Sequence, residues 1–327
     1  MNKATIPFAE IYGPVESDLA VAARIFDEEL ASALPHVNEL CDVVRSCRGK
    51  MLRPALLLLS GKAVGNVSRV HHRLAAVVEM VHAATLVHDD VLDEADERRG
   101  RAPVNAVAGN AAAVLLGDYL ISHAFHLCSG LRDQHASRRI GATTNVVCEG
   151  ELLQNFARGD LSLDESGYLE IVRRKTGALT ATSCELGAYA ADAEDHVVEA
   201  LRCYGMSVGV AFQIIDDLLD IVGDRDKVGK TLGSDLALGK LTLPTIHCLR
   251  IAGEATSARL RDMFNGCAVF DRELLCKLLA RSSSVDYAIS VANDHVSDAL
   301  GRLDSLPPSE SRASLATAAE FIVAREF

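Results

Sequence analysis

Apolar residues recur every three or four positions along most of this chain, and that spacing restricts the fold more than any other feature of the sequence. It is visible from Ser17 to Ala33 and continues through two long apolar stretches, Val67 to Glu94 and Glu194 to Val222. A repeat near 3.6 residues places the apolar side chains on one face of an α-helix. No segment alternates as a half-buried strand does, and no linker rich in Pro, Ser or Gly divides the chain. We therefore predict a single all-α domain over residues 1–327.

The composition favours helix as well. Hydrophobic residues make up 49% of the chain and aromatic residues 5%, with no Trp. Ala and Leu, which dominate the apolar set, lose little conformational entropy in a helix. Gly and Pro predict loops at residues 99–110, 158–167 and 223–239, and Gly177 predicts a break in an otherwise helical segment. Asp164 and Ser166 are the candidate N-caps at the end of the second loop.

Charge and cysteine usage exclude several classes of protein. The net charge of −12 argues against a general affinity for nucleic acid. The nine Cys are scattered without a CxxC pair, so we expect reduced thiols and no disulfide framework. The first ten residues lack the apolar core of a signal peptide, and no apolar run approaches the roughly 20 residues that span a bilayer. These features predict a cytoplasmic protein.

Two clusters of Asp with the same spacing stand at the ends of the two long apolar stretches. They consist of Asp89, Asp90 and Asp93 in the first cluster and Asp216, Asp217 and Asp220 in the second. Residues four apart share a helix face, and like charges there are destabilising without a partner. A hard divalent cation such as Mg²⁺ prefers such oxygen ligands, together with phosphate and water. A single cluster is equally well explained as a solvated helix end, but two identical clusters on apolar helices favour a metal–phosphate site.

Cationic residues near both clusters predict the binding of an anion. They are Lys50 and Arg53 at an expected helix start, Arg98 and Arg99 after the first cluster, Lys175 near the middle of the chain, and Lys230 and Lys240 after the second cluster. Helix N-termini favour phosphate, and Arg and Lys side chains bind its oxygens. Each cation alone is more simply an exposed surface residue. A nucleotide P-loop is rejected at Lys230, because Asp224 occupies the position where that motif needs Gly.

Three polar side chains on apolar segments complete the candidate site. His82 lies two turns before Asp89, Gln213 lies three residues before the second cluster, and Gln154 ends the segment 149–154. A histidine on an apolar helix is often only a satisfied core residue. Its helical phase with Asp89 nevertheless places both side chains toward roughly the same side. We expect His82, Gln213 and Gln154 to reach a ligand.

Together these motifs resemble the trans-isoprenyl diphosphate synthase family. The resemblance covers about residues 45 to 245 and is carried by five segments: Gly49-Lys50-x-x-Arg53-Pro54, residues 79–100, Lys175-Thr176, Phe212-Gln213-x-x-Asp216-Asp217-x-x-Asp220, and residues 229–244. It implies an orthogonal helix bundle of the isoprenoid synthase type around a deep central cavity, usually as a homodimer. It also implies a Mg²⁺-dependent prenyltransferase that joins isopentenyl diphosphate to an allylic prenyl diphosphate in a 1'-4 head-to-tail condensation.

The resemblance assigns a role to each of the motif residues. It implies two or three Mg²⁺ ions per active site, held by Asp89, Asp90 and Asp93 on one side and by Asp216 and Asp220 on the other. It places the allylic diphosphate on Arg98, Lys175, Lys230 and Lys240, and isopentenyl diphosphate on Lys50, Arg53, His82 and Arg99. Thr176 and Gln213 are expected to line the reacting centre.

The residues just before the first cluster bear on product length. Val81, Ala84 and Thr85 are small or medium in size. In the family, an aromatic residue at the position of Ala84 or Thr85 stops chain growth at about the C15 stage, so the resemblance implies a long all-trans polyprenyl product. Such products commonly become quinone side chains, and their greasy tails imply peripheral membrane contact at release. The cavity floor is expected near Phe125, Asn145 or Val146.

Three other readings remain open at this point. A short-chain synthase making a C15–C20 product, such as geranylgeranyl diphosphate, is the nearest. A class I terpene cyclase usually lacks the second DDxxD cluster and the cations for isopentenyl diphosphate. A non-catalytic subunit of a heteromeric synthase usually lacks one Asp cluster, whereas both are intact in this sequence.

Overall fold

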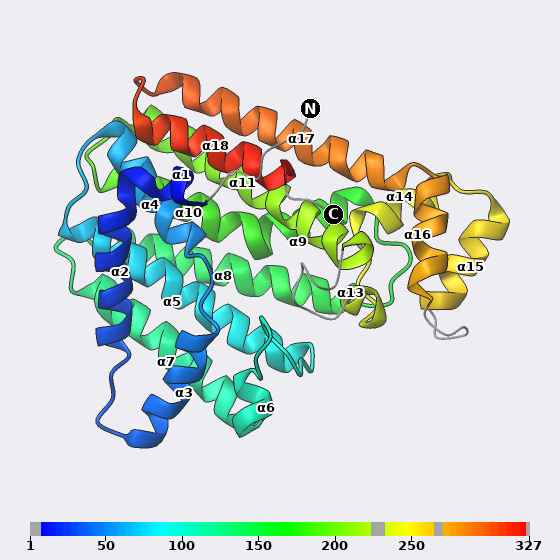
Figure 1. The fold of residues 1–327 in the computed structure, drawn as a ribbon, viewed down its shortest axis with the longest axis horizontal. Helices are drawn as coiled ribbons and strands as arrows, with labels where there is room; N and C mark the ends of the chain where they lie inside the picture. Colours follow the sequence, from blue (N-terminus) through cyan, green and yellow to red (C-terminus); the bar gives the residue numbers. More distant parts are fainter. Residues whose placement is uncertain (1–7, 224–232, 265–270, 325–327) are drawn as a thin grey trace.

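The computed structural model describes residues 8–223, 233–264 and 271–324, and within these ranges it contains helices and no strand (Figure 1). The all-α prediction is therefore confirmed. The helices are α1 (Phe8–Tyr12), η1 (Gly13–Val15), α2 (Glu16–Glu29), α3 (Pro35–Ser46), α4 (Leu52–Val64), α5 (Arg69–Leu92), α6 (Val104–Ala108), α7 (Asn110–Ser129), α8 (His135–Phe156), α9 (Glu165–Val172), η2 (Arg173–Gly177), α10 (Ala178–Tyr189), α11 (Asp195–Val222), α13 (Ser234–Ala237), α14 (Leu243–Ile251), α15 (Glu254–Phe264), α16 (Arg272–Arg281), α17 (Ser284–Arg302), η3 (Leu303–Ser305) and α18 (Glu310–Ala324).

The helix ends follow local chemistry. The side chain of Asp164 accepts a hydrogen bond from the Gly167 N–H at 2.8 Å, which confirms one of the two predicted N-caps of α9. The predicted loop at residues 99–110 contains one short helix, α6, that the sequence analysis missed. Pro103 precedes α6 and Gly109, with φ 83°, ends it. Both residues were read as loop signals, although Pro also favours the start of a helix.

The break predicted at Gly177 is a widened π-helical turn rather than an end of the helix. This turn, η2, joins α9 to α10 and carries Lys175 and Thr176. Neighbouring helices pack closely against this turn. A Cβ atom added to Gly150 of α8 would lie 2.7 Å from the backbone nitrogen of Lys175, and one added to Gly209 of α11 would lie 2.8 Å from the Gly177 Cα. Glycine at these positions lets three backbones approach closely, and π-turns of this kind are frequent at functional sites.

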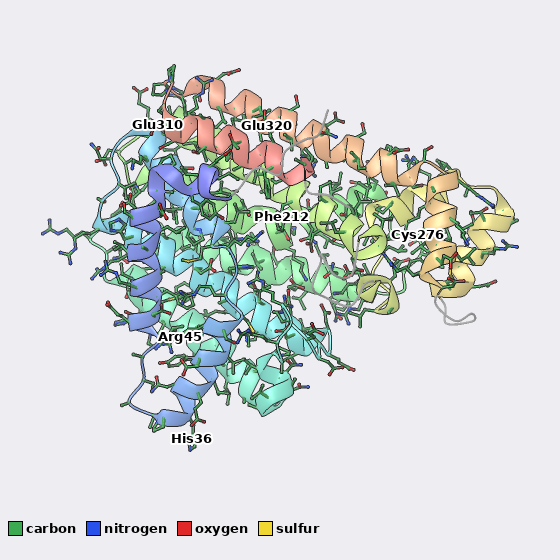
Figure 2. The ribbon with its side chains drawn as sticks, in the orientation of Figure 1. His36, Arg45, Phe212, Cys276, Glu310 and Glu320 are labelled. Atoms are coloured by element: carbon green, nitrogen blue, oxygen red, sulfur yellow. The ribbon has the colours of Figure 1, made fainter. Side chains whose placement is uncertain are left out.

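The long helices α5 and α11 form the centre of the bundle. α5 packs against α7 and α4, whereas α11 packs against α10 and α17. A continuous apolar core extends from Ile11 near the N-terminus to Ile322 in α18, and α14 to α16 enclose a smaller apolar cluster at one end of the molecule (Figure 1). Phe212 of α11 lies near the middle of the molecule, far from Cys276 on α16 (Figure 2). The second Asp cluster begins one turn after Phe212.

α7 and α8 leave apolar side chains in solvent. The large exposed ones are Val114, Leu115 and Phe125 on α7 and Leu152, Leu153 and Phe156 on α8. We call these six residues the α7–α8 apolar strip. By length and composition alone α7 is also apolar enough to cross a membrane, which the sequence analysis did not anticipate; 39% of its most apolar window is buried in the bundle. The remainder of that window includes residues of the strip.

Candidate active site

The last turn of α5 presents two carboxylates to cations from distant parts of the chain. Asp89 lies 3.5 Å from the Lys175 Nζ of η2. Asp93 contacts two cations, the Lys240 Nζ at 2.7 Å and the Arg158 Nη2 at 2.7 Å. Lys175 and Lys240 were predicted as diphosphate ligands, whereas Arg158 was missed because nothing in its loop sequence marks it. These cations balance carboxylates that would otherwise repel one another.

Asp90 does not join Asp89 and Asp93. Its side chain is 3% exposed and accepts a hydrogen bond from the Arg98 Nε at 2.6 Å. Burial raises the pKa of Asp90, and the Arg98 guanidinium opposes that shift. Neighbouring residues of a helix point in different directions, so Asp90 lies on another side of α5 than Asp89. On that side Asp90 and Arg98 line a separate pocket.

Lys175 is the most strongly coordinated cation of the site. Its Nζ lies 2.8 Å from the Glu151 Oε2 and 3.0 Å from the Gln154 Oε1, both on α8. Burial by itself lowers the pKa of Lys175, but the carboxylates of Asp89 and Glu151 outweigh it and raise the pKa above its ordinary value. Lys175 is therefore a permanent positive charge. Glu151 was not predicted, although its place one residue after Gly150 sets it beside η2.

A chain of hydrogen bonds connects η2 to the second Asp cluster. The Thr176 hydroxyl donates to the Gln213 Oε1 at 2.8 Å, and the Gln213 Nε2 donates to the Asp217 Oδ1 at 2.7 Å. The Tyr168 hydroxyl donates to the other oxygen of Asp217 at 2.6 Å. Burial first, and then the nearby Asp235 carboxylate, raise the pKa of Asp217 to about 7, while the two donated hydrogen bonds oppose the rise. The predicted neighbours Thr176 and Gln213 are thus brought together.

Lys240 links the two clusters through the segment after α11. Its side chain, 6% exposed, lies between Asp93 and Asp235, whose Oδ1 is 3.6 Å from the Lys240 Nζ. The Asp235 N–H in turn donates to the Asp220 Oδ2 at 3.2 Å, so Asp220 is buried against α13. Asp216 is half-buried on α11. Lys230 lies outside the described residues.

The donor atoms of the site suit a hard divalent cation that binds together with an anionic ligand. Among the residues that the structure describes, no three side chains of His, Cys, Asp or Glu are grouped closely enough to enclose a metal ion. The carboxylates are divided between the end of α5, with Asp89 and the C-cap residue Asp93, and α11, with Asp216. Mg²⁺ needs only one or two carboxylates when phosphate and water supply its other ligands. The residues present fit that mode of binding.

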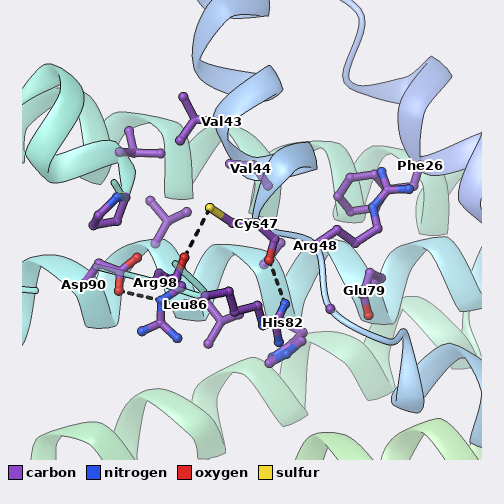
Figure 3. Close-up of a pocket in the computed structure, with 16 residues that line it drawn as sticks. Phe26, Val43, Val44, Cys47, Arg48, Glu79, His82, Leu86, Asp90 and Arg98 are labelled. Atoms are coloured by element: carbon purple, nitrogen blue, oxygen red, sulfur yellow. Dashed lines mark hydrogen bonds and ion pairs between the residues drawn. The ribbon is translucent and has the colours of Figure 1, made fainter. Parts of the chain in front are cut away.

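A second group of cations lines a pocket on the other side of α5 (Figure 3). Figure 3 shows Glu79, His82 and Leu86 of α5 among the residues that line this pocket, together with Val44 and Cys47 at the end of α3. Arg99 enters this pocket, where its Nη1 donates to the Cys47 carbonyl at 2.6 Å. A Cβ on Gly49 would lie 2.5 Å from the Arg99 guanidinium, so the Gly of the early basic motif makes room for this side chain.

His82 is surrounded by positive charge. Burial, followed by Arg53, Arg99 and Arg98, lowers the pKa of His82 well below its ordinary value. The imidazole is therefore neutral at physiological pH and can donate or accept a hydrogen bond. The structure brings Arg53, His82 and Arg99 together, as the resemblance implied. Lys50 precedes α4 and is exposed.

Glu79 and Arg48 belong to this pocket and were not predicted. Glu79 is buried, and burial raises the pKa of its carboxyl while Arg53 and Arg48 lower it. One of its oxygens, Oε2, accepts no hydrogen bond from the part of the chain that the structure describes. Arg48 lies over the Phe26 ring at 4.3 Å and pairs with Asp27. The spacing of Glu79, three residues before His82, was the one signal that could have identified it.

The residues predicted to control product length are mostly packed into the core. Val81 is 1% exposed and Ala84 is 0% exposed, whereas Thr85 is half-buried and its hydroxyl donates to the His82 carbonyl at 2.8 Å. Thr85 lies one helical turn before Asp89. This is the position expected of a residue that lines the cavity for the growing chain, an expectation that we call the cavity model. Any larger side chain at Ala84 would displace its neighbours, because protein interiors are close-packed.

Comparison with known proteins places this geometry in context. Residues 34–273 match the family model described as polyprenyl synthetase. The chain is 33% identical over 312 residues to octaprenyl diphosphate synthase of Escherichia coli, which covers 94% of this chain and 96% of that protein. A decaprenyl diphosphate synthase structure from Rhodobacter capsulatus is 34% identical with a TM-score of 0.92, over 98% of this chain and 100% of that one. A polyprenyl synthase structure from Caulobacter crescentus, complexed with calcium and isoprenyl diphosphate, is 31% identical with a TM-score of 0.94, over 98% of both chains.

Proposed function

The chain belongs to the polyprenyl synthetase family, and we propose that it condenses isopentenyl diphosphate with an allylic diphosphate to build a long all-trans polyprenyl diphosphate. One observation carries the proposal. Two separate groups of cations flank the last turns of α5, one around Asp89 and Asp93 and the other around His82. An enzyme that joins two substrates, each of which carries a diphosphate group, needs two anion subsites side by side.

The allylic diphosphate binds next to Asp89 and Asp93 in this proposal. On its arrival Lys175, Lys240 and Arg158 transfer from the carboxylates to the phosphate oxygens. The carboxylates of Asp89, Asp93, Asp216 and Asp220 would hold two or three Mg²⁺ ions. When bound, Mg²⁺ supplies Lewis-acid stabilisation of the departing diphosphate. The permanent charge of Lys175 acts in the same direction, because it faces the group on which negative charge develops.

Isopentenyl diphosphate binds in the other pocket, on Arg53, Arg99, His82 and Lys50. The allylic C–O bond breaks and its electron pair leaves with the diphosphate, and the isopentenyl double bond then forms the new C–C bond. A proton is lost to the released diphosphate. No side-chain nucleophile takes part, so the residues of the chain act by placing the two substrates and by excluding water.

A second candidate function, a short-chain synthase, differs from the proposed one in the length of its product. A short-chain product such as geranylgeranyl diphosphate is favoured by the complete burial of Val81 and Ala84, which leaves those two side chains outside any open channel in the ligand-free protein. The long-chain assignment rests on the absence of an aromatic side chain at Ala84 and Thr85 and on the octaprenyl and decaprenyl relatives.

The decisive experiment is the mass of the product. Purified protein is incubated with isopentenyl diphosphate and geranyl, farnesyl or geranylgeranyl diphosphate in the presence of Mg²⁺, and the dephosphorylated products are separated and weighed. Polyprenols beyond C30 support the proposal. A product that stops at C20 supports the short-chain rival, and a cyclic hydrocarbon or an absence of any condensation overturns the family activity for this chain.

Three further parts of the proposal concern the cell. The α7–α8 apolar strip, with Leu115 69% and Phe156 80% exposed, forms the interface of a homodimer, because apolar patches of this kind mark protein–protein contacts. The enzyme works in the cytoplasm and touches the membrane peripherally when the greasy product leaves. That product supplies quinone side chains. Mass of the native particle, fractionation and quinone analysis of a deletion strain test these three statements separately.

A further inference from the structure

The hydrogen bonds that connect η2 to the second Asp cluster restrict the orientation of the Gln213 carboxamide. Its members come from three elements: Tyr168 from α9, Thr176 from η2, and Gln213 and Asp217 from α11. All the links are between 2.6 and 2.8 Å. Tyr168, Thr176 and Asp217 are each less than a tenth exposed, so water does not compete for these contacts.

The direction of each hydrogen bond follows from the chemistry of the groups. The Tyr168 hydroxyl donates to the Asp217 Oδ2, and the ionised form of Asp217, which the hydrogen bonds from Tyr168 and Gln213 favour, can only accept. The Asp217 Oδ1 therefore requires a donor from Gln213, which can offer only its Nε2 group. The carboxamide is thereby fixed with Oε1 toward Thr176, and the Thr176 hydroxyl must donate to it. The Thr176 proton is engaged, so its oxygen presents lone pairs to the reacting centre.

We propose that Tyr168 and Asp217 are positioning residues that fix the Gln213 carboxamide, so that Gln213 and Thr176 present oxygen atoms to the allylic carbon. This role rests on the proposed function. Preorganised oxygen dipoles stabilise the positive charge that develops on the allylic carbon, and they need no reorganisation during the reaction. Asp217, the middle carboxylate of the second cluster, thus has a different role from the predicted metal ligands Asp216 and Asp220.

The packing around η2 supports a fixed geometry. A Cβ on Gly209 would lie 2.8 Å from Gly177 and 3.2 Å from the Thr176 carbonyl oxygen, so α11 and the π-turn are in backbone contact one turn before Gln213. Thr180 also holds the turn, because its hydroxyl donates to the Thr176 carbonyl at 3.1 Å. The distance from Thr176 to Gln213 is thereby set by backbone rather than by flexible side chains.

The first test removes single links. Tyr168→Phe deletes one donor. Asp217→Asn keeps the shape but adds an amide, and when the amide oxygen keeps the hydrogen bond from Tyr168, its NH2 group faces Gln213 and the Gln213 carboxamide turns over. We expect kcat to fall about tenfold in the first variant and about 100-fold in the second, with KM for both diphosphates within about threefold of the wild type. Tyr189→Phe is the matched control, because the Tyr189 hydroxyl donates to Asp133 on the surface. Its kcat should not change.

The second test restores the direction of the hydrogen bonds. In the double variant Asp217→Asn with Gln213→Glu, the amide introduced at position 217 would donate to the carboxylate introduced at position 213, which would again accept from Thr176. We expect the double variant to exceed Asp217→Asn alone at least tenfold in kcat, and Gln213→Glu alone to be impaired, since it sets two carboxylates face to face. Such non-additivity is expected of residues that contact each other or belong to one hydrogen-bond network, and not of distant, independent sites.

The outcomes separate this positioning role from the assignment of function. A wild-type kcat in Asp217→Asn, a loss confined to KM, or a double variant no better than Asp217→Asn would overturn the positioning role while the wild-type enzyme still condenses its substrates. Thermal midpoints of all five variants identify a general loss of folding. Such a loss would lower kcat and the midpoint together and would leave the double variant without rescue. An inactive wild-type protein would instead reject the proposed function.

Discussion

The Lys240 Nζ lies 2.7 Å from the Asp93 Oδ2, although 147 residues separate the two in the sequence. Asp93 caps the end of α5, and Lys240 lies between α13 and α14, after the second Asp cluster. This ion pair therefore joins two segments that the sequence could describe only separately. In the ligand-free protein the cations rest on the carboxylates. A negatively charged substrate can pair with the Lys and Arg side chains while divalent cations pair with the carboxylates, so that no buried charge is left unpaired.

Removal of the Lys240 charge should therefore impair both folding and turnover. Lys240→Met leaves Asp93 and Asp235 facing each other without their shared cation, so we expect a loss of about 3 kcal/mol in stability, which is typical of a broken buried pair. We also expect kcat/KM for the allylic diphosphate to fall at least 100-fold. Thermal unfolding and steady-state kinetics measure the two effects. Lys277→Met, which breaks an exposed pair with Glu273, is the control and should change neither.

Turnover should depend on a divalent cation. Asp89 and Asp93 take their counter-charges from Lys and Arg side chains, and the substrate brings further negative charge, so excess EDTA should abolish condensation and added Mg²⁺ should restore it. Product formation from labelled isopentenyl diphosphate is the readout. The unfolding midpoint should be little changed by EDTA, since the ion pairs hold the ligand-free fold. Full activity in EDTA would refute the metal dependence.

A bulky residue at Ala84 should shorten the product. Ala84→Phe places a ring beside Thr85, the residue one turn before Asp89, and the resemblance to the family then implies products that end near C15. Since Ala84 is 0% exposed, the variant should also lose about 1–3 kcal/mol in stability through overpacking. Chromatography of the dephosphorylated products measures the first effect and thermal unfolding the second. Ala255→Phe, on the exposed surface of α15, is the control. An unchanged product ladder in Ala84→Phe would contradict the cavity model.

Acid should weaken the fold through His71. The His71 Nε2 donates to the Gly187 carbonyl at 3.0 Å, and its Nδ1 accepts from the Ser68 N–H at 3.1 Å, so the neutral ring satisfies both neighbours. Burial lowers the pKa of His71 below 6.5. The unfolded chain then takes up a proton at a higher pH than the folded one, so this stability is complete above about pH 6.5 and is lost as the pH falls below it.

The check is the midpoint of thermal unfolding between about pH 5 and pH 8. We expect the wild-type midpoint to fall with acidification more steeply than that of His71→Gln, whatever the stability of the variant at neutral pH. His36→Gln serves as the control, because the His36 side chain is 94% exposed and its Nδ1 pairs with the Glu39 carboxylate at 3.4 Å (Figure 2). Parallel slopes in wild type and His71→Gln would count against the prediction.

The α7–α8 apolar strip should determine the oligomeric state. Leu115→Glu introduces a charge at its most exposed residue on α7, and we expect a dimer of the wild-type protein to dissociate to monomers at micromolar concentration. Light scattering coupled to gel filtration measures the mass. Val70→Glu changes a residue on α5 outside the strip and should leave the dimer intact. A wild-type protein that is monomeric at all concentrations would reject the interface.

Local patterns determined the helices and the family of this protein. The apolar period predicted α5 and α11 nearly to their ends, because side-chain burial on one face is a local property of a helix. The repeated spacing of the Asp clusters was equally readable. The turn around Lys175 was located at the correct Gly but not recognised as a π-turn, since the extra residue is stabilised by close backbone contact with Gly150 and Gly209. The roles assigned to individual site residues stay predictions.

What only the tertiary structure decided is how these residues pair. Equivalent carboxylates have different partners: Asp90 is buried on Arg98, Asp217 on Tyr168 and Gln213, while Asp93 faces Lys240. Arg158, which also reaches Asp93, had no sequence signal at all. Helical periodicity fixes which side of its own helix a side chain occupies, but the neighbour that it meets depends on where other helices cross. A charge in a folded protein acts through that neighbour, over a few ångströms, and no local pattern encodes it.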